Sequence, residues 1–150
     1  MEAEVYPDPE VSEFISENFV PVRFDVRKDP QPMERFGANW TPTILILDAD
    51  GNERHRIEGF LPKDDFLAQI KLGLAHAAFV AKRFDESEQR FREIVEKHPD
   101  SDSAPEAQYW AGVSKYKGTG NGAALGETAQ AFQQRYKDSP WAKKASIWAA

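Results

Sequence analysis

The chain has 150 residues, 41% of them hydrophobic, and carries a net charge of −6. This length suits one ordinary domain or two small ones, and 10 Phe with 4 Trp exclude a largely disordered chain. The absence of cysteine excludes disulfide bonds and thiol chemistry by these residues, and no apolar run approaches the roughly 20 residues that a membrane helix needs.

Neither half of the sequence forms a basic patch. Up to Leu72 there are 8 Lys and Arg against 15 Asp and Glu, and from Gly73 onward there are 11 against 10. Proteins that bind nucleic acid neutralise phosphates with clustered Lys and Arg, so we do not expect nucleic acid as a partner. We expect the acidic surface to serve mainly solubility.

A helix and a strand are the first clear elements in chain order. Asp8 can cap a helix with Pro9 at its first position, and apolar residues at helical spacing extend it to about Asn18. The preceding segment, Glu2 to Val5, fits the end of a helix that starts further upstream. Apolar residues at every second position from Val20 to Val26 then predict a strand.

A β-hairpin is predicted next. A charged turn leads into a short helix over Pro32 to Phe36, and Gly37 is a good residue to end it. The run Thr43 to Leu47 is β-branched and aliphatic, which favours a buried strand. The turn signal Asp50-Gly51-Asn52 connects it to a third strand near Glu53 to Glu58.

Six short motifs follow one another through this region. They are Phe19-Val20-Pro21-Val22, Asp25-Val26, Arg35-Phe36-Gly37, Trp40-Thr41-Pro42-Thr43, Asp48-Ala49-Asp50-Gly51 and Gly59-Phe60. Their order resembles the second half of a thioredoxin domain, over roughly residues 1–72. The resemblance implies an α/β thioredoxin-like fold in this part of the chain.

The resemblance also implies a peptide-binding site. In thioredoxins a cis-proline precedes a strand, and the backbone before it pairs with a bound peptide as an added strand. Pro42 occupies that place, so the candidate binding residues are Trp40, Thr41 and Pro42. The alternatives are a Pro42 that only shapes its loop and a Trp40 that belongs to the core or to an interface.

Two features of thioredoxins are missing from the sequence: the first strand and the Cys-x-x-Cys motif at the following helix start, where a thiol pKa is lowered. We therefore expect an incomplete sheet and no dithiol chemistry as given. In the family the missing strand lies between the strands matching Val20 to Val26 and Thr43 to Leu47. These strands would close on each other, or their open edges would pair in a homodimer.

From Gly73 to the end the pattern is helical. Breaks near Arg83, at His98-Pro99-Asp100, over Gly118 to Gly122 and before Pro140 divide it into helices, with Tyr136 placed on the fourth. A shift of 38 residues aligns similar positions, which indicates a repeat. The aligned pairs are Ile94 with Phe132, His98 with Tyr136, and residues 107–111 with 145–149.

This region resembles tetratricopeptide-type helical hairpins. Leu74, Ala75, Ala78, Phe84, Phe91 and Pro99 match the kinds of residue that the motif uses, whereas Ser87 and Ile94 depart from its alanines. We expect two domains: a thioredoxin-like domain lacking its first strand and redox motif over residues 1–72, and tetratricopeptide-like helical repeats with an incomplete last unit over residues 73–150.

Two functions are compatible with this organisation. The first is a redox-inactive module that binds a protein or peptide, and the second is a fragment of a thiol–disulfide oxidoreductase whose Cys-x-x-Cys lies upstream of Met1. We expect no cofactor and no metal site, since His55, His76 and His98 lack metal-ligand spacing. Two localisations are compatible with the sequence: cytoplasmic by default, or extracytoplasmic if a leader precedes Met1.

Overall fold

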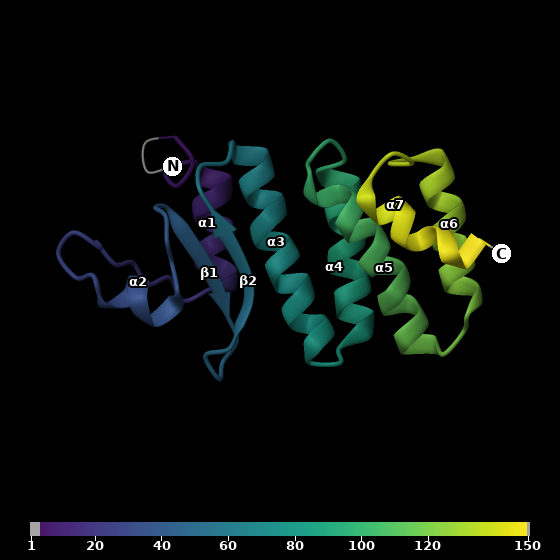
Figure 1. The fold of residues 1–150 in the computed structure, drawn as a ribbon, viewed down its shortest axis with the longest axis horizontal. Coiled ribbons are helices and arrows are strands. Elements are labelled where there is room, and N and C mark those ends of the chain that lie inside the picture. Colours follow the sequence, from purple (N-terminus) through teal and green to yellow (C-terminus); the bar gives the residue numbers. More distant parts are fainter. Residues whose placement is uncertain (1–3, 150) are drawn as a thin grey trace.

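The computed structural model describes residues 4–149. Figure 1 shows a two-stranded sheet with helices packed beside it at one end of the molecule, and a row of helices that extends to the other end. None of the helices in the described part of the chain has the combined length and hydrophobicity of a membrane span.

Helix α1 (Pro9–Asn18) confirms the predicted first helix. The Asp8 carboxylate accepts hydrogen bonds from the backbone N–H groups of Glu10 and Val11, and Pro9 holds the first helical position. The segment before it was expected to end a helix, but its described residues, from Glu4, form turns. Glu2 and Ala3 lie outside the described residues.

The predicted hairpin is also confirmed. Helix α2 (Gln31–Phe36) ends at Gly37, whose φ of 63° is the left-handed conformation that glycine adopts readily. Strands β1 (Thr43–Leu47) and β2 (Glu53–Glu58) pair antiparallel, with Ile46 opposite His55. The Asp48 carboxylate accepts from the N–H of Asn52, 2.9 Å away, and so holds the turn.

The strand predicted over Val20 to Val26 is wrong. This segment contains no strand, and among the described residues the sheet consists of β1 and β2 alone. Val20, Val22 and Phe24 are 92%, 72% and 51% exposed, so their alternation buries no face. A strand exists only when its backbone pairs with a neighbour. No strand among the described residues pairs with this segment, and it does not close on β1.

Helix α3 (Lys63–Val80) joins the sheet to the other helices. Phe66, Leu67 and Ile70 lie in a core with Val11 of α1 and Ile57 of β2. On another face of α3, Ala68, Leu72 and Ala75 lie in a second core with α4 (Phe84–Lys97) and α5 (Ser103–Thr119). The division expected between residues 72 and 73 therefore falls inside a single helix.

The remaining helices follow in a row (Figure 1). They are α6 (Ala123–Gln134), α7 (Pro140–Ala145) and the 3₁₀-helix η1 (Ser146–Ala149). The breaks predicted near Arg83, at residues 98–100 and before Pro140 are confirmed. Two details were wrong: Gly118 lies within α5, and Tyr136 lies beyond the end of α6 with a φ of 65°.

Candidate peptide-binding site

The loop between α2 and β1 carries all three candidate binding residues. The Trp40 side chain is 66% exposed, which excludes a place in the core. The Thr41–Pro42 peptide bond is cis. The Thr43 hydroxyl donates to the backbone carbonyl of Trp40, 2.6 Å away, and ties the loop to the first residue of β1. An exposed aromatic ring therefore stands beside the start of a strand.

The backbone at this point is available for pairing. Pro42 uses its carbonyl to accept from the N–H of Gly59, 2.8 Å away, on the β2 side. Within the described part of the chain, the N–H and C=O of Thr41 make no hydrogen bond, and β1 pairs with β2 along one edge only. A second extended segment could pair with the other edge.

Arg56 of β2 is hydrogen-bonded to the backbone where this loop begins. Its guanidinium donates to the carbonyl oxygens of Gly37, 3.2 Å away, and of Phe36, at the end of α2. It also forms an ion pair with Glu53 at 2.6 Å, and this bond raises the pKa of the guanidinium above its ordinary value. Sequence reasoning missed Arg56, because its partners lie 19 and 20 positions away.

The histidines lie away from this loop. His55 and His76 are stacked, with 6.3 Å between ring centroids, although 21 positions separate them in the sequence. His55 Nε2 is 2.6 Å from the Gln69 amide oxygen, and His76 Nε2 is 3.3 Å from a Glu106 carboxylate oxygen. Among the described residues no group of His, Asp and Glu could hold a metal ion.

His98 belongs to a partly buried polar cluster that the sequence did not reveal. Its Nδ1 lies 2.7 Å from an Asp64 carboxylate oxygen, and its Nε2 lies 3.0 Å from the Lys71 ammonium nitrogen. His98 is 3% exposed and Lys71 is 8% exposed. Because 27 and 34 positions separate these partners, only the packing of the α4–α5 turn against α3 brings them together.

Comparison with known proteins gives a match for the N-terminal half of the chain. Residues 1–73 match the model of the thioredoxin-like domain family. This segment is a thioredoxin-like domain. Trp40, Thr41 and Pro42 all lie within it, and it ends in the middle of α3.

A 53-residue stretch of the chain is 38% identical to the chloroplastic thioredoxin-like protein HCF164 of Oryza sativa subsp. japonica. The match covers 35% of this chain and 20% of that protein, so the chain corresponds to about a fifth of its relative's length. No solved structure matches the chain. The thioredoxin-like domain thus accounts for the sheet, α1, α2 and the first part of α3.

Proposed function

We propose that the chain is a binding module whose thioredoxin-like domain takes up an extended protein or peptide segment along β1. One observation carries the proposal: the exposed Trp40 and the unpaired backbone of Thr41 lie at the start of a strand whose second edge is open in the described structure. A bound segment would gain main-chain hydrogen bonds from β1 and apolar contact from the Trp40 ring.

The alternative expected from the sequence was thiol–disulfide exchange. This reaction begins with attack by a thiolate, and the chain contains no cysteine. We therefore propose no dithiol turnover for these 150 residues. Reduction of insulin by dithiothreitol should proceed at the uncatalysed rate in their presence, and any faster rate would refute this part of the proposal.

Peptide selection tests the binding site. A phage-displayed library of random dodecapeptides, selected on the full chain, should yield sequences whose synthetic peptides shift the amide NMR signals of residues 40–47. Trp40→Ala should weaken their binding about tenfold or more, as expected for an aromatic anchor. Ile147→Ala is the matched control, because Ile147 is 77% exposed at the opposite end of the chain.

Two results would refute the site: selected peptides that bind Trp40→Ala as well as the unmodified chain, or amide shifts confined to the helices beyond α3. A homodimer is the second possible occupant of the open edge. Sedimentation velocity identifies it, since a dimer at micromolar concentration would mean that a second copy covers β1. A monomer leaves the edge open to other partners.

For the helical part we propose tetratricopeptide-like repeats over residues 73–150 that mediate protein contacts. The 38-residue equivalence of His98 and Tyr136 supports this organisation. His98 reaches back to Asp64 at the start of α3, and the Tyr136 hydroxyl reaches back to the carbonyl of Pro99. The α6–α7 turn is thus bonded to the α4–α5 turn, and the α4–α5 turn to the start of α3, as expected when successive units stack.

The proposed repeats share α3 with the thioredoxin-like domain. We therefore expect the two parts to unfold together. Urea denaturation followed by amide NMR signals from β1 and from α5 should give the same midpoint for both. Two midpoints would show instead that the division lies at a flexible boundary.

A further inference from the structure

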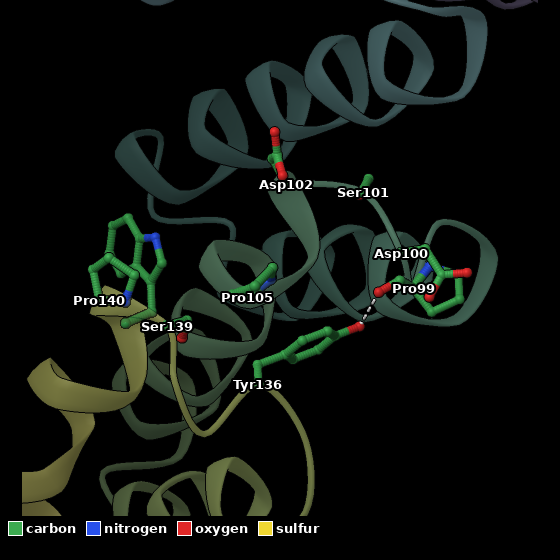
Figure 2. A pocket seen from close by; sticks show the side chains of 9 residues that line it. Pro99, Asp100, Ser101, Asp102, Pro105, Tyr136, Ser139 and Pro140 are labelled. Atoms are coloured by element: carbon green, nitrogen blue, oxygen red, sulfur yellow. Dashed lines mark hydrogen bonds between the residues drawn. The ribbon is translucent and has the colours of Figure 1, made fainter.

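A hollow of about 490 Å³ lies between the turn that joins α4 to α5 and the turn that joins α6 to α7. One wall consists of residues 99–102 with Pro105 of α5, and the other of Tyr136 with residues 139–141 (Figure 2). The hollow belongs to the helical half of the chain and shares no residue with the candidate peptide-binding site.

Tyr136 bridges the two walls. In Figure 2 its ring reaches from the α6–α7 turn toward Pro99, and its hydroxyl donates to the Pro99 carbonyl oxygen, 2.5 Å away. Burial raises the pKa of the Tyr136 hydroxyl, which therefore stays protonated as the donor. This hydrogen bond links the two walls of the hollow.

The wall formed by the α4–α5 turn carries negative charge without a counter-charge. Asp100 and Asp102 are exposed, and within the described part of the chain neither carboxylate makes an ion pair or a hydrogen bond. The backbone N–H of Asp102 donates to the Asp65 carboxylate.

The opposite wall carries the aromatic rings, and each already has a cation of the chain beside it. Arg135 lies 5.2 Å from the centre of the Tyr136 ring, and Lys144 lies 4.1 Å from the centre of the Trp141 ring. Arg135 and Lys144 therefore lie against aromatic rings, and within the described residues neither forms an ion pair with Asp100 or Asp102.

We propose that this hollow binds a cationic side chain of a partner protein, with the guanidinium group of arginine as the preferred occupant. A guanidinium is planar, so it can stack on an aromatic ring while its N–H groups donate to a carboxylate. Lys144 shows that the Trp141 ring accepts a positive charge in this structure. The proline rings of both walls would cover the alkyl stem of the side chain.

The test uses the ¹⁵N-labelled full chain and two capped tripeptides, Ac-Ala-Arg-Ala-NH₂ and its citrulline counterpart. Citrulline keeps the length and shape of arginine but has no charge. The arginine peptide should shift the amide signals of residues 100–103 and 136–142 in a saturable way. The citrulline peptide should bind about tenfold more weakly.

Two double variants then test whether binding depends on the carboxylates of the hollow or only on the net charge of the chain. Asp100→Asn with Asp102→Asn should weaken the arginine peptide about tenfold. Glu13→Gln with Glu17→Gln removes the same charge from the exposed side of α1 and should have no effect. The proposal is overturned if both variants lose affinity equally, if the aspartate variant loses none, if citrulline binds as well as arginine, or if these residues do not shift. Shifts confined to residues 40–47 would assign the peptide to the β1 site instead.

Discussion

The guanidinium group of Arg56 donates a hydrogen bond to the backbone carbonyl of Gly37, across 3.2 Å. A second bond reaches Phe36, and Glu53 holds the same guanidinium in an ion pair. Strand β2 thereby fixes the end of α2, from which the loop with Trp40 begins. Arg56 is a positioning residue for the candidate peptide-binding site, since it acts on the loop through the backbone.

Replacing Arg56 should loosen that loop without unfolding the chain. Arg56→Met keeps an unbranched side chain but removes the donors to Phe36 and Gly37. We expect the amide hydrogens of Gly37 and Ala38, which donate to carbonyl groups of α2, to exchange with solvent about tenfold faster, because roughly the contribution of one hydrogen bond is lost locally. Hydrogen exchange followed by NMR measures this change.

Arg54→Met is the matched control, because Arg54 lies on the same strand and pairs instead with Asp48 at 2.7 Å. It should leave exchange at Gly37 and Ala38 unchanged and affect only the β1–β2 turn. Equal effects of both variants on Gly37 and Ala38 would show that Arg56 contributes to the general stability of the strand and does not position the loop.

Close packing of α5 against α6 depends on Gly112. A Cβ atom at this position would overlap the hydroxyl, Cβ and methyl group of Thr128. Gly112→Ala should therefore lower the free energy of unfolding by about 1–3 kcal/mol, the usual cost of overpacking a core, despite the better helix propensity of alanine. Urea denaturation measures the change.

Gly126→Ala provides the comparison within α6. A Cβ there meets only the carbonyl oxygen of Trp148, at an ordinary 3.9 Å. The substitution should stabilise the chain by about 0.5–1 kcal/mol through helix propensity. If Gly112→Ala were equally stabilising, the contact between α5 and α6 would have to be looser than the structure shows.

His55 should make stability depend on pH. Burial is the main cause that lowers its pKa below the ordinary value of 6.5, and charge on His76 lowers it further, while the bond to Gln69 opposes the shift. The folded chain then binds fewer protons at this site than the unfolded chain does. Its contribution to stability is complete above about pH 6.5 and declines as the pH falls toward the folded pKa.

His55→Gln removes the titrating group and retains a polar side chain near Gln69. Between about pH 7 and pH 5, urea denaturation should show a smaller loss of stability for this variant than for the unmodified chain. The other titrating groups remain in both proteins, so the difference reports His55 together with its charge interactions with Glu53, Glu106 and His76. Parallel curves over this interval would contradict the prediction.

Elements with local signals could be predicted from the sequence. The Asp8-Pro9 start of α1, the end of α2 at Gly37 and the Asp50-Gly51-Asn52 turn each depend on residues within a few positions of one another. The predicted strand at Val20 to Val26 failed because a strand depends on a partner as well as on alternation. An alternating pattern cannot show whether that partner is present.

The residues of the candidate sites also divide into those that the sequence could predict and those that it could not. Trp40, Thr41 and Pro42 could be named because a resemblance located them in one short motif. Arg56, which holds their loop, could not, because its hydrogen bonds exist only once β2 and α2 are side by side. Tyr136 was placed on a helix by spacing alone, whereas its φ of 65° and its bond to Pro99 follow from packing against the preceding turn.

The buried pair of Lys71 and His98 allows a test of how the α4–α5 turn is held on α3. Asp64 accepts the Nδ1 proton of His98, which leaves Nε2 to accept from the Lys71 ammonium group. Lys71→Met would strand a buried acceptor, and it would also remove the weaker ion pair with Glu93 at 3.7 Å. We expect the free energy of unfolding to fall by about 1–3 kcal/mol. Lys97→Met removes an exposed partner of the same Glu93 and should have little effect.

Replacing both members of the pair decides whether the hydrogen bond is the cause. Combining Lys71→Met with His98→Leu leaves apolar groups facing each other, so the second substitution should cost less than it does alone. A double-mutant cycle in urea should give a coupling energy of about 1 kcal/mol or more. Strictly additive effects would mean that Lys71 and His98 stabilise the turn separately, through packing alone. Coupling would instead identify their hydrogen bond as the link between the α4–α5 turn and the helix that completes the thioredoxin-like domain.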